Sequence, residues 1–383
     1  MCLNVLSGSV LLKISCLIFL LTTHVSHAQE IADDQVPVLP GVTSLTRQGA
    51  RDIVRDATDI VSPNGIIDED FVEIGGIEQW VSVRTKDAGN PVLLFIHGGP
   101  GSTEAPVSWL YQNAWEDYFT VVQWDQRGAG KTLAANAIED LPQTVSIERM
   151  VTDGLELVAY LREKFQRQKI YVLGHSWGTV IGLEIAQRKP SWLHAYIGMG
   201  QAINFRENEA LGYNFALQNA KEENNKAAIK ELEQIAPYPP EVDRVPIQSI
   251  VVQRKWLMYY GGMTFGRKDL SYEINAKLLS PTYTDADIEA DQFAGIALVK
   301  LMQELENLDY KTVTKIECPV FILAGQHDYA TSTQLAKEWI DNLDAPYKKF
   351  IYYDNVAHMI QLEAPGRLLV HLVNDVLPLS AVN

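Results

Sequence analysis

The sequence of 383 residues contains no run that is rich in lysine or arginine, and its formal net charge is −16. A surface that binds phosphate groups needs clustered positive charge, so the composition argues against nucleic acid and anionic membranes as partners. The acidity is typical of a soluble, self-repelling surface, and it is also compatible with acidic groups that attract a cationic substrate. We therefore expect the partner to be a small peptide or another small molecule.

Cysteine is scarce: the chain has only Cys2, Cys16 and Cys318. The first two lie in an N-terminal segment that we expect to be removed, and a single remaining cysteine excludes an internal disulfide. Cys318 directly precedes an apolar run at 319–323, which predicts packing in the core rather than a reactive thiol. The sequence also lacks an H-E-x-x-H motif and a cysteine cluster, so we expect neither a metal nor a cofactor.

Long hydrophobic runs are missing as well. The most apolar segment, Ile14–Leu21, follows Lys13 and is too short to span a bilayer comfortably. The small residues Ser26 and Ala28 then precede Gln29 in the pattern that signal peptidase cleaves. We interpret residues 1–28 as a signal peptide and expect an exported protein, periplasmic or secreted, without membrane attachment after cleavage.

From residue 66 onward, short apolar runs alternate with helical patterns. A hairpin is predicted from 71–74 and 80–83, which are joined through Gly75 and Gly76. Six further strands are predicted at 92–96, 119–122, 170–173, 195–197, 320–323 and 350–353. Their continuous apolarity fits strands covered on both faces, and the intervening helices at 146–165 and 366–377 are amphipathic. The alternation predicts an α/β fold with a mostly parallel central sheet and helices on both faces.

One long stretch interrupts this alternation. Residues 204–312 are mostly helical in pattern and contain a proline-rich break at 237–240. We interpret this stretch as a helical cap inserted between the sixth and seventh strands. The predicted organisation is a signal peptide at 1–28, an N-terminal arm at 29–65, the first part of the core at 66–203, the cap at 204–312 and the second part of the core at 313–383.

The motif Gly174-His175-Ser176-Trp177-Gly178 lies between a predicted strand and an apolar helix. The pattern G-x-S-x-G in this context indicates a nucleophile elbow, in which the serine occupies a strained turn and small neighbours let the strand approach the helix. We predict that Ser176 is the nucleophile. The pattern alone would occur by chance in some chains, so its strand-to-helix context carries the prediction.

A serine hydroxyl needs a base, and the base needs an acid that orients it. In the fold that carries this elbow, the acid and then the histidine follow later strands. Asp328 follows the strand at 320–323, and His358 follows the strand at 350–353. We therefore predict a triad of Ser176, Asp328 and His358. Asp354 is the nearest rival acid, but it shares its loop with His358.

The oxyanion of a tetrahedral intermediate requires hydrogen-bond donors. The backbone N–H of Trp177, next to the nucleophile, is one predicted donor. The second is expected from the glycine-rich loop at 97–101, where Gly99 is the first choice and Gly98 the second. Glycines allow backbone amides to approach a ligand without obstruction by side chains.

Three motifs together give a specific resemblance: H-G-G-P-G at 97–101, W-D-Q-R-G-A-G at 124–130 and G-H-S-W-G at 174–178. The sequence resembles the proline iminopeptidase (prolyl aminopeptidase) family, cap-bearing serine peptidases of the α/β-hydrolase fold. The resemblance implies an α/β-hydrolase core with an inserted helical cap and release of N-terminal proline from peptides. It also implies that Asp125 and Arg127 support the active site, and we expect them to form a structural ion pair.

The family binds the free amino group of its substrate with glutamates from the cap. The resemblance places Glu207 and Glu209 at this position, although the local sequence differs from the family's usual spelling. An ordinary solvated helix start explains these acidic residues almost as well. Glu231 and Glu233 are second candidates. A group of aromatic residues in the cap either lines a pocket for a flat ring or forms the cap's own core: Trp256, Tyr259 and Tyr260.

Three functions remain open at this point. The first is an exported aminopeptidase that releases N-terminal proline or another small residue through an acyl-enzyme. The second is a carboxylic ester or lactone hydrolase that uses the same triad. The third is a binding protein without activity on a hydrolase scaffold, which the complete triad and oxyanion loop argue against.

The predicted signal peptide can be tested directly. We expect the mature protein to begin at Gln29 and to be recovered outside the cytoplasm, because Ser26 and Ala28 suit the cleavage site. N-terminal sequencing of secreted or periplasmic material measures this. A chain that keeps Met1 and sediments with membranes would contradict it.

Overall fold

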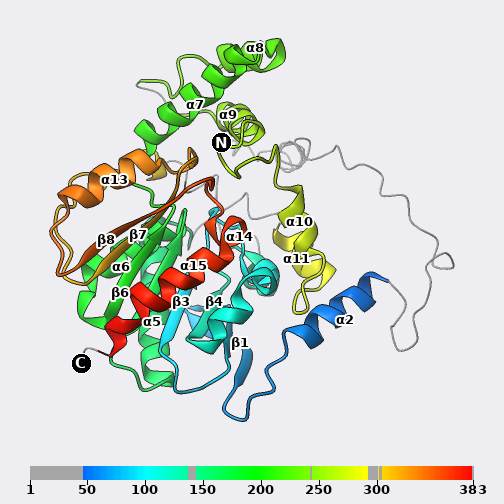
Figure 1. Ribbon diagram of the computed structural model, residues 1–383, viewed down its shortest axis with the longest axis vertical. Coiled ribbons are helices and arrows are strands. Elements are labelled where there is room, and N and C mark those ends of the chain that lie inside the picture. Colours follow the sequence, from blue (N-terminus) through cyan, green and yellow to red (C-terminus); the bar gives the residue numbers. More distant parts are fainter. Residues whose placement is uncertain (1–45, 137–143, 242–243, 292–300, 302–303, 382–383) are drawn as a thin grey trace, which may run out of the picture.

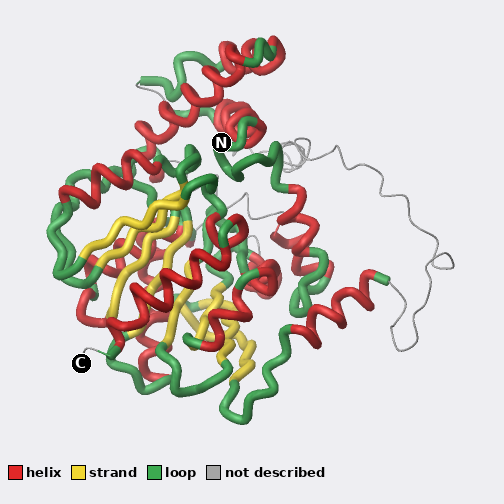
Figure 2. The backbone as a smooth tube through the Cα atoms, viewed as in Figure 1, coloured by secondary structure: helices red, strands yellow, loops and turns green. Residues whose placement is uncertain are grey.

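The computed structural model describes residues 46–136, 144–241, 244–291, 301 and 304–381. A central sheet of eight strands, in the order β1-β2-β4-β3-β5-β6-β7-β8, organises the molecule (Figures 1 and 2). Strands β3 to β8 pair in parallel, whereas β2 runs antiparallel to both β1 and β4. The predicted α/β fold and its mostly parallel sheet are confirmed. The predicted signal peptide lies outside the described residues.

The eight strands coincide with the eight that the sequence pattern predicts. They are β1 (Ile66–Ile74), β2 (Ile77–Thr85), β3 (Val92–Ile96), β4 (Thr120–Trp124), β5 (Ile170–His175), β6 (Leu193–Met199), β7 (Val320–Gly325) and β8 (Lys348–Tyr353). Of these, β3 has the predicted bounds, β4 is shifted towards the C-terminus, and the other six are longer. The β1–β2 hairpin closes at the pair Ile74 and Ile77, as its glycine pair predicts. Strands β3, β4, β5 and β7 are buried along their whole length, which explains why their sequences are mostly apolar.

Helices cover both faces of the sheet, and each face has its own apolar core. One core includes residues of α5 (Ile147–Lys164), α6 (Gly178–Arg188) and α13 (Thr333–Asn342). The other includes residues of α14 (Ile360–Glu363), α15 (Pro365–His371) and η3 (Gln112–Asp117). Leu94 and Ile96 point to the first core, while Leu93 and Phe95 point to the second, because side chains alternate along a strand.

Between β6 and β7 the chain forms the helices of the predicted cap. They are α7 (Phe205–Glu222), α8 (Lys226–Gln234), α9 (Ile247–Tyr259), α10 (Ser271–Lys277) and α11 (Asp285–Asp291). Figure 1 shows α7, α8 and α9 beyond one end of the sheet, with α10 and α11 beside it. Asn204 caps α7 by accepting a hydrogen bond from the N–H of Glu207, which fixes where the helix starts.

The N-terminal arm contributes the helix α2 (Arg47–Ala57), which lies against the cap. Arg47 and Arg51 both donate to the carbonyl oxygen of Leu278, and both pair with Asp285. Helix α2 of the arm is thus attached to the cap segment around α10 and α11. Among the described residues, no helix has the length and apolarity needed to cross a bilayer.

The described residues also form five short elements: η2 (Ala105–Leu110), α3 (Gly130–Ala135), η4 (Pro190–Trp192), η5 (Leu372–Val376) and η6 (Leu377–Ser380). The predicted helix at 366–377 is α-helical only up to His371. It then widens into the π-helical turn η5.

The expected ion pair between Asp125 and Arg127 is wrong. Arg127 forms a two-pronged contact with Asp153 on α5, with Nε–Oδ2 and Nη2–Oδ1 distances of 2.8 and 3.2 Å. Asp125 instead accepts hydrogen bonds from the hydroxyl of Tyr283 in the cap and the N–H of Lys131. Both residues are buried and have structural roles. Arg127 connects the loop after β4 to α5, whereas Asp125 connects the cap to the core.

The buried pair gives a stability prediction. Asp153→Asn should lower the free energy of unfolding by about 3–5 kcal/mol, because it leaves the fully buried Arg127 without its counter-ion. Glu148, on the same helix, pairs with Arg188 while two-thirds of its side chain is exposed, so Glu148→Gln should cost only about 0–1 kcal/mol. Urea unfolding of both variants measures the difference. Equal losses of unfolding free energy in the two variants would show that burial of the ion pair does not determine the cost of breaking it.

Candidate active site

Ser176 lies at the sharp turn between β5 and α6. Its φ is +54°, a left-handed conformation that non-glycine residues rarely adopt. A Cβ on Gly174 would come within 2.4 Å of the Gly178 carbonyl oxygen, and one on Gly178 within 2.0 Å of the Ile96 carbonyl oxygen. Only glycine fits at either position, which explains both glycines of the motif. The strained turn presents the serine at the carboxyl edge of the sheet, as in a nucleophile elbow.

The structure brings the predicted acid and base together. Asp328 follows β7 and His358 follows β8, and His358 Nδ1 lies 2.8 Å from Asp328 Oδ2. The carboxylate also accepts hydrogen bonds from the N–H groups of Ala330 and Thr331 and from the Thr331 hydroxyl, at 2.9, 2.8 and 3.0 Å. Both side chains are buried. The hydrogen bonds from Ala330 and Thr331 therefore fix the carboxylate of Asp328, which in turn orients the imidazole of His358.

This geometry determines which imidazole nitrogen can act as a base. A carboxylate can only accept, so Nδ1 carries the proton, and Nε2 of the neutral ring keeps its lone pair. The backbone N–H of His358 donates to the carbonyl oxygen of Met263, which ties the base loop to the cap. The rival acid, Asp354, is exposed, and its backbone carbonyl accepts a hydrogen bond from Arg367.

The glycine-rich loop lies against the elbow. A Cβ on Gly98 would lie 3.1 Å from the Cβ of Ser176, so the loop backbone passes directly over the serine. Gly99 adopts a φ of +110°, which L side chains rarely reach. Trp177 is the N-cap of α6, at the helix end where the first N–H groups have no partner within the helix. Trp177 is next to Ser176 in the chain and Gly98 lies against it, while the roles of Trp177, Gly99 and Gly98 as oxyanion donors stay predictions.

His175, next to the predicted nucleophile, is buried and makes polar contacts. Its Nε2 lies 3.1 Å from the carbonyl oxygen of His358, and the two imidazole rings are 4.9 Å apart. Its Nδ1 lies 3.4 Å from Oε1 of Glu104. Glu104 could not be predicted from the sequence, because nothing in the loop pattern signals that its acidic side chain turns inward.

Three further histidines have local roles. The ring of His327 stacks on Phe265 at 4.4 Å, and His371 pairs with Asp375 one helical turn away. His194 lies within β6, where burial lowers its pKa to about 4. Each is therefore engaged away from the Asp328–His358 pair.

The two cap glutamates named by the resemblance differ in environment. Glu207 is exposed and pairs with Lys311. Glu209 is fully buried and contacts both the guanidinium of Arg254 and the hydroxyl of Tyr238. The structure therefore gives each carboxylate a partner within the protein, and their contact with a substrate amine stays a prediction.

The second candidates belong to the cap's own architecture. Glu231 accepts hydrogen bonds from Lys255 and from the indole N–H of Trp256, while Glu233 is exposed on α8. Trp256 packs in the cap core, and Tyr259 and Tyr260 contact that core. Of the two roles considered for these aromatics, the structure supports the core of the cap.

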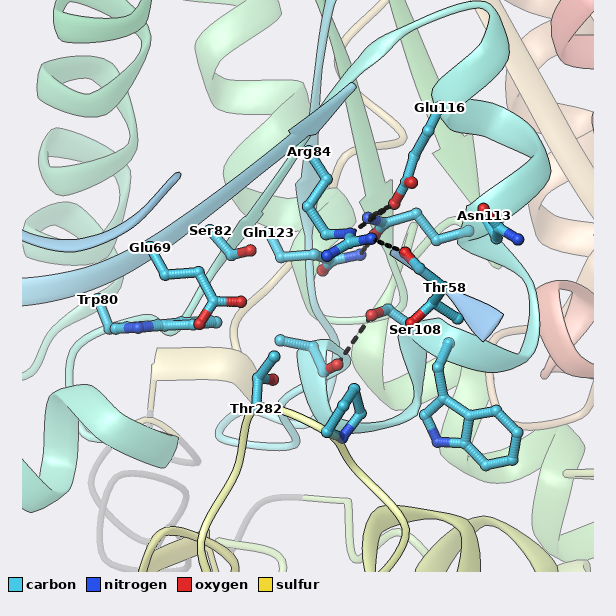
Figure 3. A pocket seen from close by; sticks show the side chains of 14 residues that line it. Thr58, Glu69, Trp80, Ser82, Arg84, Ser108, Asn113, Glu116, Gln123 and Thr282 are labelled. Atoms are coloured by element: carbon cyan, nitrogen blue, oxygen red, sulfur yellow. Dashed lines mark hydrogen bonds and ion pairs between the residues drawn. The ribbon is translucent and has the colours of Figure 1, made fainter. Parts of the chain in front are cut away.

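A pocket lies between the β1–β2 hairpin, the η2–η3 segment and the cap (Figure 3). Arg84 lies in this pocket and pairs with Glu116 at 2.8 Å, and Trp109 and Thr282 also line it. None of the predicted triad residues lines it. We therefore place the candidate active site at the elbow and not in this pocket.

Within the described part of the chain, no cluster of histidine, cysteine, aspartate and glutamate has the arrangement of a metal site. Cys318 is a buried free thiol next to β7, and burial raises its pKa to about 12. It is therefore protonated at neutral pH and unreactive, in keeping with its predicted place in the core.

Comparisons with known proteins agree with this architecture. Residues 91–365 match the family model described as alpha/beta hydrolase fold. The probable aminopeptidase YbaC of Bacillus subtilis (strain 168) is 27% identical over 298 residues, which cover 77% of this chain and 92% of that protein. The proline iminopeptidase of Heyndrickxia coagulans is 24% identical over 309 residues, which cover 79% and 96% of the two chains.

Solved structures show the same fold. A proline iminopeptidase-related protein from Thermus thermophilus superposes with a TM-score of 0.59 at 21% identity, covering 82% of this chain and 99% of that one. The proline iminopeptidase of Mycobacterium smegmatis gives a TM-score of 0.58 at 19% identity, with the same coverage. The chain is a hydrolase of the α/β-hydrolase fold family, in which it is similar to the proline iminopeptidases.

Proposed function

We propose that this protein is a serine hydrolase in which Ser176, His358 and Asp328 carry out acyl transfer. The observation that supports this most is the 2.8 Å contact between Asp328 and His358 at the edge where the strained elbow presents Ser176. His358 Nε2 takes the proton of the Ser176 hydroxyl as its oxygen attacks the substrate carbonyl. The same nitrogen then returns the proton to the leaving group, and water releases the acyl group by the reverse roles.

The negative charge that develops on the carbonyl oxygen needs donors that are already in place. In this proposal the backbone N–H of Trp177 and that of Gly99, or Gly98, supply them. Removing one such donor from a related site typically costs about 2.7–4 kcal/mol of transition-state stabilisation. The tight contact between the loop and the elbow supports the proposal, because fixed donors need no rearrangement during the reaction.

We further propose that the substrate is a peptide with a free N-terminus and that N-terminal proline or another small residue is released. The similarity to an aminopeptidase and a proline iminopeptidase over more than three-quarters of the chain supports this choice. An ester or lactone hydrolase is the second candidate. It is favoured by one observation: Glu207 and Glu209 already pair with cations of the protein, so neither charge is left for a substrate amine. Export of the mature chain remains part of the proposal.

The nucleophile is tested by Ser176→Ala. We expect this variant to lose hydrolysis and labelling by a fluorophosphonate probe while it stays folded, because the hydroxyl oxygen is the attacking atom. Mass spectrometry of the labelled wild type locates the modified residue. Labelling that persists in the variant would place the nucleophile elsewhere.

The specificity is tested with proline naphthylamide and its N-acetylated form. We expect the acetylated substrate to be cut at least about 30-fold more slowly, because loss of one partner of a desolvated charge pair costs about 2–5 kcal/mol. Equal rates would contradict the aminopeptidase and favour the ester hydrolase.

Two matched variants then locate the amine contact. A contact at Glu209 predicts that Glu209→Gln lowers kcat/KM for proline naphthylamide far more than for a neutral ester. Glu207→Gln, on the exposed side of the same helix, serves as the control. Equal loss on both substrates would mean that Glu209 only holds Arg254 and Tyr238.

A further inference from the structure

A second buried acid–histidine pair lies beside the predicted triad. Glu104 belongs to the loop after β3, five residues beyond Gly99, and its side chain is buried. Oε1 lies 3.4 Å from His175 Nδ1 and accepts a hydrogen bond of 2.8 Å from the amide of Gln361. Oε2 accepts a hydrogen bond of 3.3 Å from the hydroxyl of Tyr111. One carboxylate therefore joins the oxyanion loop, the elbow and the helix α14 that follows the base.

His175 connects Glu104 to the loop that carries His358. Its Nε2 lies 3.1 Å from the main-chain carbonyl of His358, and a carbonyl oxygen can only accept, so Nε2 carries a proton. Nδ1 then faces Glu104 and the Gln361 amide, which is also 3.4 Å away. Because Nε2 is already bonded to a backbone oxygen, His175 is not available as a second base. It connects Glu104 to the backbone of His358.

The charges agree with this arrangement. Burial raises the pKa of Glu104, but the hydrogen bond and charge of His175, the charge of Lys277 and the bond from Gln361 outweigh it and hold the pKa below the ordinary value. Burial and the neighbouring Glu104 raise the pKa of Tyr111 well above 10, so its hydroxyl keeps the proton that it donates. Glu104 is thus an ionised carboxylate that accepts hydrogen bonds from Gln361 and Tyr111 and lies against His175.

We propose that Glu104 is a positioning residue for the acyl-transfer reaction: through His175 it fixes the main chain of His358, and through its own loop it fixes the oxyanion donors against Ser176. This proposal rests on the proposed function. Glu104 touches neither Ser176 nor the reacting atoms, so it acts through the geometry of other groups. A displacement of about 1 Å in such a site can lower the rate about 100-fold.

The variants Glu104→Ala, Glu104→Gln and Glu116→Ala separate positioning from general stability. Glu116 is also a buried carboxylate in the segment after β3, but it points to Arg84 and not to the site (Figure 3). For Glu104→Ala we expect kcat on a neutral ester to fall about 10- to 100-fold, with little change in KM, because the base and the oxyanion donors lose their alignment. Glu104→Gln keeps the length and an acceptor oxygen, so its kcat should lie between those of Glu104→Ala and the wild type.

The Glu116→Ala variant shows whether the loss of kcat is specific to Glu104. We expect Glu116→Ala to be destabilised towards urea like Glu104→Ala, yet to keep the kcat of the wild type when assayed under conditions where circular dichroism shows both variants to be folded. Equal losses of kcat in Glu104→Ala and Glu116→Ala, or a wild-type kcat in Glu104→Ala, would overturn the positioning role.

The rate of fluorophosphonate labelling distinguishes this failure from failure of the proposed function. Slower labelling of Ser176 in Glu104→Ala than in Glu116→Ala supports the positioning role, because the probe requires an aligned base and no substrate recognition. Labelling at the wild-type rate overturns the positioning role alone. Absence of labelling at Ser176 in the wild type would overturn the proposed serine hydrolase itself.

Discussion

The tight turn at Ser176 is the constraint on which the rest of the site depends. A non-glycine residue at a φ of +54° is strained by about 1–3 kcal/mol, and it persists only where the surroundings leave no alternative. Here the surroundings are the backbones of β3 and α6, which Gly174 and Gly178 allow to approach without side chains between them. The N–H of Ser176 is in turn bonded to the carbonyl of Met199 at the end of β6. Two neighbouring strands and one helix therefore hold the serine in a conformation that it would not adopt alone.

The core supplies the triad candidates, but the cap helps to place them. Asn208 on α7 accepts a hydrogen bond from the N–H of Ser332 and donates to the carbonyl of Ala330, so α7 is fastened to the loop that carries Asp328. The N–H of His358 donates to Met263, which lies in the cap as well. Movement of the cap would therefore reach both the acid and the base, and not only the opening above them.

The strands and helices could be predicted where the sequence has a clear hydrophobic pattern. Continuous apolarity at β3, β5 and β7 reflects burial on both faces, and the order of serine, acid and histidine follows from the order of the strands. Contacts between side chains that are distant in the sequence could not be predicted in the same way. Arg127 pairs with Asp153 of α5 rather than with the nearby Asp125, and Gln79 of β2 donates to the same carboxylate. Only the three-dimensional packing determines that choice.

The same reason explains why Glu104 escaped notice, whereas Asp328 did not. Asp328 stands at the place where the fold requires an acid, so its position carries information. Glu104 stands in a loop where most acidic side chains would face water, and its inward orientation depends on partners from three separate segments: Tyr111, His175 and Gln361. A buried carboxylate is stable only with such partners, because removing the charge from water is costly. The buried acids Asp153, Glu209, Glu104 and Asp328 all meet this condition. They differ in what they hold in place. Asp153 holds the loop after β4 and the hairpin to α5, and Glu209 holds the interior of the cap. Asp328 contacts the imidazole of His358, and Glu104 is connected to the main chain of His358 through His175.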